Sequence, residues 1–305
     1  MPQLRQFDGV LLKKVRIGRA VLGPRPAIVL TVTDRETPGQ IQKIKNLVQG
    51  KRRFPLLLEV RIDRFRHLER RFVLVRHSEN SGDLSTLAVS AESLETRPSP
   101  ETAPALTART DFSDAALERV TALKKLRIPL IATVRAQKEG GAFFLSNAAR
   151  QALYRTLLPH VDAIDIELAS RRLIRSLVPL AHRQGKRVIL SYHHFSRTPP
   201  DAQIKHLIEK GKREGADLVK IAVTPQKKSD IGRLLLLTYR HREKGVIAIA
   251  MGRRGASSRF LAPFFGSLLT YSFVGRSQAP GQIPVRQLLK KIHPLFSPFK
   301  PWRKT

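Results

Sequence analysis

Lys220 stands in the middle of an apolar stretch, residues 216–225 (A-D-L-V-K-I-A-V-T-P), whose pattern is typical of a strand buried on both faces. An ammonium group is costly to bury there unless its charge is paired, or unless its pKa has fallen and the amine is neutral. A neutral lysine beside a carbonyl substrate is a nucleophile that forms a Schiff base. The alternative is that Lys220 lies at the end of the strand and extends its charged tip into solvent.

Other polar side chains stand at or just after the ends of further short apolar runs. They are Glu59, Arg61, Asp63, Arg135, Glu139, Asp165, Glu167, Ser191, His193, Arg259, Gln278 and Gln282. Structural explanations exist for many of them, because buried charges such as Glu59, Arg61 and Asp63 could simply pair with one another. His193 and His194 are neighbours on a predicted strand and point to opposite faces, so at most one of them can enter a shared site.

The elements that must position these residues repeat regularly along the chain. Short apolar runs, each followed by a helical pattern, occupy residues 27–32, 55–63, 129–134, 161–168, 187–193, 216–225, 246–250 and 268–274. The expected helices cover residues 37–50, 113–126, 147–158, 170–184, 200–214, 229–243, 257–265 and 285–292. Repeated βα units with apolar strands indicate an α/β fold with a parallel sheet, and eight of them favour a closed (β/α)8 barrel of the TIM type. Active sites of such barrels lie at the carboxyl ends of the strands, where the polar residues above are expected to meet.

We expect residues 1–305 to form a single barrel domain with three appendages. Residues 1–25 are basic and punctuated by Gly and Pro, which predicts an N-terminal arm or short strands. Residues 79–112 contain a segment rich in Pro, Ser, Thr and Glu, which predicts a flexible insertion. Residues 293–305 are expected to form a C-terminal tail.

The chain is strongly basic, with 56 Lys and Arg against 24 Asp and Glu and a net charge of +32. Such a charge attracts nucleic acids, anionic membranes and anionic metabolites. The basic residues are scattered, and no aromatic stripe accompanies them, so a solvated basic surface is favoured over a dedicated nucleic-acid site. No apolar run approaches membrane-spanning length and the first residues do not resemble a secretion signal, which predicts a soluble, cytoplasmic protein.

Metal and thiol chemistry have little support in the sequence. The chain has no cysteine, which excludes disulfides, thiolate ligands and cysteine nucleophiles. No H-x-H or H-x-x-E-H spacing occurs, so we expect no metal site.

Blocks of sequence around the polar residues are more specific than any single motif. The main blocks are L-E-V-R-I-D at 58–63, T-V-R-A-Q-K-E-G-G at 133–141, D-A-I-D-I-E-L at 162–168, V-I-L-S-Y-H-H-F at 188–195, A-D-L-V-K-I-A-V-T-P-Q at 216–226, A-M-G-R-R-G-A-S-S-R at 250–259 and A-P-G-Q-I at 279–283. In this order they resemble type I 3-dehydroquinate dehydratase, a barrel enzyme that forms a Schiff base. The resemblance covers roughly residues 27–292, apart from the insertion.

The resemblance implies that Lys220 forms an imine with the ketone of 3-dehydroquinate, with His193 as the general acid and base and Glu139 tuning that histidine. It implies no cofactor, and a product, 3-dehydroshikimate, on the shikimate route to aromatic amino acids. The residues expected to bind the substrate are Glu59, Arg61 and Arg135 at its hydroxyls, Arg259 and Gln282 at its carboxylate, and Gln278. It does not settle the oligomeric state, for which a homodimer stays an option.

The chain departs from the family pattern at several positions. His194 replaces the common Asp or Asn after His193 and could alter the pKa of that histidine. Gln278 stands where the family usually has serine, so a longer amide replaces a small hydroxyl that contacts the substrate. Tyr271 replaces a frequent phenylalanine, which we interpret as a change in packing.

Two alternative functions stay open at this point. A barrel lysine also serves other Schiff-base aldolases and lyases, although these do not require the histidine and both arginines. In a different class, the net charge of +32 would suit a nucleic-acid-binding protein on a barrel that has lost catalysis. Salt-sensitive binding of nucleic acid without turnover would favour the second alternative.

Overall fold

Eight parallel strands form a closed barrel, which confirms the predicted (β/α)8 fold. The computed structural model describes residues 4–7, 10–23, 25–49, 54–65, 73–74, 88–89, 107–142 and 144–296. Around the barrel the strands are β5 (Ala27–Val32), β6 (Leu56–Arg61), β9 (Leu130–Thr133), β10 (Ala163–Glu167), β11 (Arg187–His194), β12 (Leu218–Val223), β13 (Val246–Ala250) and β14 (Leu269–Phe273). Strand β14 pairs in parallel with β5, and the Leu268 N–H donates to the Val246 carbonyl at 3.1 Å, which closes the circle at β13. Each of the eight predicted apolar runs contains one barrel strand.

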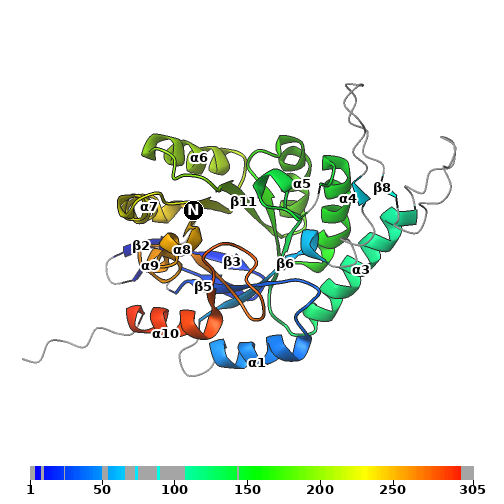
Figure 1. Ribbon diagram of the computed structural model, residues 1–305, viewed down its shortest axis with the longest axis horizontal. Coiled ribbons are helices and arrows are strands. Elements are labelled where there is room, and N and C mark those ends of the chain that lie inside the picture. The colour runs from blue at the N-terminus through cyan, green and yellow to red at the C-terminus, as the bar shows by residue number, and fades with distance from the viewer. Residues whose placement is uncertain are drawn as a thin grey trace, which may run out of the picture.

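Helices surround the strands on the outside of the barrel (Figure 1). They are α1 (Pro38–Gln49), α3 (Thr107–Lys124), α4 (Asn147–Leu157), α5 (Arg171–Arg183), α6 (Asp201–Arg213), α7 (Lys228–Arg240), α8 (Gly252–Gly255), α9 (Ser258–Phe264) and α10 (Val285–Leu295). Helix α3 begins at Thr107, earlier than the start expected at residue 113, because no Gly or Pro between these positions interrupts the helix. Helix α10 contains the first residues of the expected tail, and the rest of the tail lies outside the described residues.

Two short antiparallel hairpins lie before and after the first barrel units. One is formed by β1 (Leu4–Phe7) and β2 (Val10–Lys13), the other by β7 (Val73–Leu74) and β8 (Ala88–Val89). Apart from β8 and the start of α3, the insertion expected at residues 79–112 lies outside the described residues. In the part of the chain that the structure describes, no helix is long and apolar enough to cross a bilayer.

The barrel strands alternate between two environments. Outward side chains pack against the helices, while inward side chains fill the barrel. Near the amino ends the inward residues are apolar and include Val29, Leu57, Ile131, Ala163, Ile189 and Leu218. Two positions further along the same strands the residues are Thr31, Glu59, Thr133, Asp165, Ser191 and Lys220, all of them buried. The same alternation therefore places an apolar layer below a polar layer inside the barrel.

A third hairpin, β3 (Val15–Ile17) and β4 (Ala20–Leu22), closes the amino-terminal end of the barrel. Its apolar side chains are buried in the same cluster as the inward residues of the strands. At its turn, Gly18 has a φ of 52° and lies so close to Asp162 that a Cβ atom would be 2.5 Å from the carboxylate. With this end filled, the polar layer is reached from the carboxyl ends of the strands.

Candidate active site

A cavity of about 260 Å³ opens at the carboxyl ends of the barrel strands. All nine residues predicted for the site line it, namely Glu59, Arg61, Arg135, Glu139, His193, Lys220, Arg259, Gln278 and Gln282. Its walls also include Thr31, Phe195, Met251 and Tyr271. The inward register of the strands and the loops after them bring these residues together from the whole length of the described barrel.

Lys220 lies inside the barrel and is only 5% exposed, which excludes the alternative that its tip extends into solvent. Its Nζ is 3.0 Å from Asp165 Oδ2 and 3.5 Å from Glu59 Oε1. The face of the Tyr271 ring lies 4.3 Å from the same nitrogen, measured to the ring centroid. The buried charge is thus compensated by pairing, and nucleophilic attack by this amine requires its proton to leave first.

His193 enters the cavity from β11, and Glu139 holds it. Glu139 ends a short 3-10 turn after β9, and its Oε2 lies 2.9 Å from His193 Nδ1 and 3.0 Å from the His193 backbone nitrogen, which donates to it. Burial, together with the charges of Arg135 and Lys220, lowers the pKa of His193 well below its usual value, so the imidazole is neutral at pH 7. Burial raises the pKa of Glu139 to about 7. His194 points away, and its Nδ1 accepts from the Ser196 backbone N–H at 3.4 Å, so one histidine of the pair enters the site.

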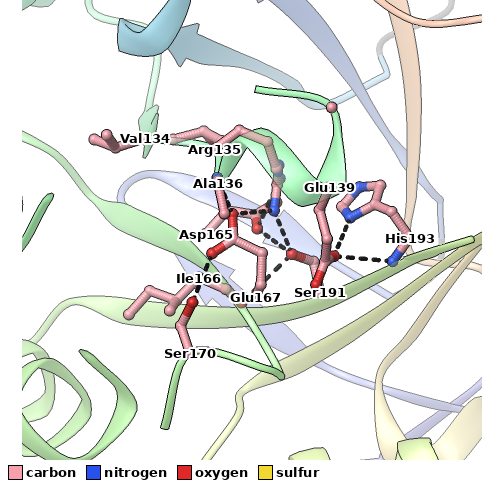
Figure 2. A network of polar contacts seen from close by, with 12 residues as sticks. Val134, Arg135, Ala136, Glu139, Asp165, Ile166, Glu167, Ser170, Ser191 and His193 are labelled. Carbon is pink, nitrogen blue, oxygen red and sulfur yellow. Dashed lines mark hydrogen bonds and ion pairs between the residues drawn. The ribbon is translucent and has the colours of Figure 1, made fainter. Parts of the chain in front are cut away.

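Arg135 connects the two acidic residues of β10 (Figure 2). Its guanidinium lies 3.0 Å from Asp165 Oδ1 and 3.2 Å from Glu167 Oε1, and it donates to Ser191 Oγ at 2.6 Å. Ser191 in turn donates to Asp165 Oδ1 at 2.6 Å. Burial alone would raise the pKa of Asp165, but the charges of Arg135 and then Lys220 lower it, so Asp165 is ionised. A continuous chain of charges therefore runs from Lys220 through Asp165 and Arg135 to Glu167.

Helix α4 braces the outer end of this chain of charges. Arg150, which is 1% exposed, pairs with Glu167 and donates through Nε to the Val134 carbonyl at 3.0 Å. The Tyr154 hydroxyl accepts from the Val134 N–H at 2.9 Å and donates to the Asp165 carbonyl at 2.5 Å. Two side chains of one helix thereby fix the ends of β9 and β10.

Arg61 is oriented by its neighbour Asp63. Its Nε and Nη2 donate to the two carboxylate oxygens of Asp63 at 2.9 and 2.7 Å, and Nη2 also reaches the Gly140 carbonyl at 3.2 Å. Asp63 in addition accepts from the backbone N–H groups of Arg135 and Ala142, each at 3.3 Å. The charge of Arg61 is therefore paired within the wall of the cavity.

The loop after β14 covers the opposite side of the cavity. Gln282 accepts from the backbone N–H groups of Gln278 and Ala279 at 2.8 and 3.2 Å, and donates to Thr31 Oγ1 at 3.2 Å. The amide of Gln278 donates to the Arg276 carbonyl at 3.1 Å, so it is turned toward its own loop. Gln282 thus ties the loop to β5.

Arg259, on α9, lies under this loop and is 2% exposed. Its Nη2 donates to the Pro280 carbonyl at 3.1 Å, and it makes no ion pair with any residue that the structure describes. Burial lowers the pKa of Arg259 to about 10. Arg259 is thus a buried cation that faces the cavity without a counter-ion among the described residues.

The described residues include no group of three His, Asp or Glu side chains suited to hold a metal ion. The donors that face the cavity are instead cations and amides, a set suited to an anionic organic molecule.

Comparison with known proteins identifies the family. The chain matches type I 3-dehydroquinase over residues 45–296. It is 36% identical to the 3-dehydroquinate dehydratase of Thermodesulfovibrio yellowstonii over 169 residues, which is 55% of this chain and 74% of that protein. The chain belongs to the type I 3-dehydroquinase family. It is therefore a hydro-lyase.

Solved structures of the same family have the same barrel. The 3-dehydroquinate dehydratase of Geobacillus kaustophilus superposes with a TM-score of 0.70 at 25% identity, covering 93% of this chain and 96% of that one. The type I enzyme of Clostridium difficile, solved with covalently modified comenic acid, also has a TM-score of 0.70, at 26% identity, covering 93% of this chain and 98% of that one.

The sequence alone does not reveal the roles of several residues in this type I 3-dehydroquinase site. Asp165, Glu167 and Ser191 stood out at the strand ends, but their spacing did not reveal that they bind Arg135 and Lys220. Arg150 lies in the middle of a helix, where an arginine is usually solvated, and no sequence signal marks it as buried. Its only hint is its place among apolar residues on the inner face of α4.

Proposed function

We propose that the chain dehydrates 3-dehydroquinate to 3-dehydroshikimate through a Schiff base on Lys220. Family membership supports the overall reaction, and the observation that carries the mechanism is a buried lysine amine in the same cavity as a neutral histidine. The cavity of about 260 Å³ suits one small cyclic metabolite.

The imine makes an otherwise weakly acidic proton removable. The Lys220 amine adds to the ketone carbon, and the carbonyl oxygen leaves as water. The protonated imine then accepts electrons when a base removes a proton from the neighbouring carbon. The electron pair returns as the β C–O bond breaks, and the departing hydroxide takes up a proton to leave as water. Hydrolysis of the imine releases the enone product and the free lysine.

His193 is the residue we assign to these proton transfers. Ionised Glu139 accepts the hydrogen on Nδ1, which leaves the lone pair on Nε2 free to take a proton. The low pKa of His193 supports the role of base, because the imidazole is neutral before substrate binds.

The remaining residues hold the substrate. Arg259 lacks a counter-ion among the described residues, which supports a role in binding the carboxylate, with Gln282 as a second donor. Glu59, Arg61 and Arg135 line the other side and are assigned to the hydroxyl groups. Gln278 covers the bound ring from the loop after β14.

Borohydride trapping tests the mechanism directly. Reduction in the presence of 3-dehydroquinate, followed by peptide mass spectrometry, should give an adduct on the peptide that contains Lys220. Lys220→Ala should give no adduct, whereas Lys228→Ala, which removes an exposed lysine, should trap as the unchanged protein does. The mechanism is wrong if the unchanged protein turns over the substrate but forms no adduct on Lys220.

His193→Ala should separate imine formation from proton transfer. We expect the variant to form the trapped adduct while kcat falls about 10²–10⁴-fold, because one residue serves the proton transfers. The rise of enone absorbance measures kcat. A kcat within a few-fold of the unchanged enzyme would show that another residue is the base.

The proposed reaction places the enzyme on the shikimate route to aromatic amino acids. Expression of the chain in a bacterial strain that lacks its own 3-dehydroquinate dehydratase should restore growth without aromatic supplements. Lys220→Ala should fail to restore it.

A further inference from the structure

The hydroxyl of Tyr271 and Nε of Arg259 are buried, and neither has a hydrogen-bond partner among the described residues. Both side chains are 2% exposed, so neither atom faces bulk solvent, and both residues line the cavity. A buried donor without a partner destabilises the free protein, so each such atom in a native fold needs an explanation.

Tyr271 reaches into the site from the inward face of β14. Its ring belongs to the apolar cluster that fills the barrel, and the Nζ of Lys220 lies 4.3 Å from the ring centroid. The hydroxyl therefore stands at the far end of the ring from its attachment to β14, within the cavity wall that Lys220 and Arg259 share. Burial, reinforced by the carboxylates of Glu59 and Asp165, raises the pKa of Tyr271. The phenol is protonated and can donate a hydrogen bond.

Other hydroxyl and amide donors in the same part of the cavity are already used. Thr31 donates to Glu59 Oε2 at 3.1 Å. The Gln278 amide donates to the Arg276 carbonyl, and Gln282 donates to Thr31. Tyr271 is thus a tyrosine on the cavity wall whose hydroxyl has no hydrogen-bond partner among the described residues.

We infer that Tyr271 is a substrate-binding residue, whose hydroxyl donates to the carboxylate that Arg259 holds. A carboxylate is the ligand group that fits. It offers only hydrogen-bond acceptors, and its negative charge supplies the counter-ion that Arg259 does not have among the described residues. This assignment rests on the proposed function and adds a residue to it. Tyr271, expected from sequence to be a packing change, supplies a polar contact.

The test compares Tyr271→Phe, which keeps the ring over Lys220, with Tyr239→Phe, which removes an exposed hydroxyl on α7. The probes are shikimate, a hydroxylated ring carboxylate, and its methyl ester, which is uncharged. Thermal shift at increasing probe concentration gives the dissociation constants. We expect Tyr271→Phe to weaken binding of the acid about tenfold, and binding of the ester less than about twofold.

The melting temperature of the ligand-free protein gives a second readout. Because Tyr271→Phe removes a buried unsatisfied group, we expect it to melt at a higher temperature than the unchanged protein. A structural role for the hydroxyl would instead lower the melting temperature. Tyr239→Phe should change neither the melting temperature nor the binding of the acid.

Turnover of 3-dehydroquinate, measured in parallel, separates the two proposals. If the unchanged protein turns over and Tyr271→Phe binds the acid equally well, the role of Tyr271 is overturned and the proposed function stands. If the acid binds and Tyr271→Phe weakens it but nothing turns over, the carboxylate site stands and the proposed function fails. If the unchanged protein does not bind the acid, the site does not take a carboxylate and the inference is wrong.

Discussion

Lys220 and Arg259 are both buried cations on the wall of the cavity, but different groups compensate their charges. Lys220 lies within 3.5 Å of two carboxylates of the protein. Arg259 donates a hydrogen bond to the Pro280 carbonyl and has no ion-pair partner among the described residues. A buried charge without a partner is costly. The fold thus supplies a counter-ion for the proposed nucleophile and leaves that of Arg259 to the ligand.

Glu139 should set the acid side of the pH profile. Its pKa is raised from 4.5 to about 7, so it takes up a proton as the pH falls through that value. The protonated pair no longer combines a neutral imidazole with an ionised acceptor, so kcat/KM, which reports groups of the free enzyme, should fall below about pH 7. Glu139→Gln cannot take up this proton, so we expect a lower plateau, by about tenfold, without the fall near pH 7.

The value of kcat/KM, measured from about pH 5 to about pH 9, checks this prediction. His193 cannot account for a fall near pH 7, because its own pKa lies well below its usual value. An unchanged acid limb in Glu139→Gln would show that another group titrates there.

Sequence patterns predicted individual site residues better than their partners. Ordered blocks marked Lys220, His193 and Arg259 because these residue types recur at strand ends in one chemistry. The sequence pattern at Tyr271 predicts only a packing role, since a phenol and a phenyl ring fit the same strand pattern. Whether its hydroxyl has a partner depends on side chains from several strands, and no local pattern contains that information.

At the scale of elements, α4 braces the active site from behind through Arg150 and Tyr154. Arg150→Met should leave Glu167 with one arginine partner in place of two, at a cost of about 3–5 kcal/mol in the free energy of unfolding. Urea unfolding measures the loss. Arg155→Met, which removes an exposed arginine from the same helix, should change stability by less than about 0.5 kcal/mol. Equal effects of the two substitutions would contradict the bracing role of Arg150.

The elements themselves were largely predictable because barrel strands and their helices follow two simple periods. All eight apolar runs became barrel strands, and seven of the eight helices start close to the expected residues. The exception, α3, begins at Thr107, where polar residues hide the helical period. The hairpin β3–β4 was foreseen only as arm or short strands, because three-residue strands carry too little pattern to reveal what they pack against.

At the scale of the whole molecule, a protein with a net charge of +32 carries a site proposed to bind an anion. Exposed basic residues follow the strands at the mouth of the cavity, and they are Lys138, Arg197, Lys227, Lys228, Arg253, Arg254 and Arg276. Cations arranged in this way raise the rate at which anions arrive, and salt screens the effect.

Catalytic efficiency should therefore depend on ionic strength. We expect kcat/KM to fall about three- to tenfold between about 20 mM and about 300 mM salt, while kcat stays nearly constant. The double variant Lys228→Gln/Arg253→Gln should reduce this dependence. Arg183→Gln, at the far end of α5, is the matched control and should leave it unchanged. A salt effect on kcat alone would contradict steering.

The pairing of β14 with β5 has a consequence for how the protein is made. The hydrogen bond from Gln282 to Thr31 joins residues 251 positions apart, and both lie on the wall of the cavity. Contacts this distant in sequence form slowly, because a long loop must close before they contribute. During synthesis, the earlier strands emerge with their inward polar layer unenclosed, and the pocket cannot exist until β14 and the following loop have been translated. Ligand binding should therefore appear as one of the last events in folding, after most of the helical signal has formed.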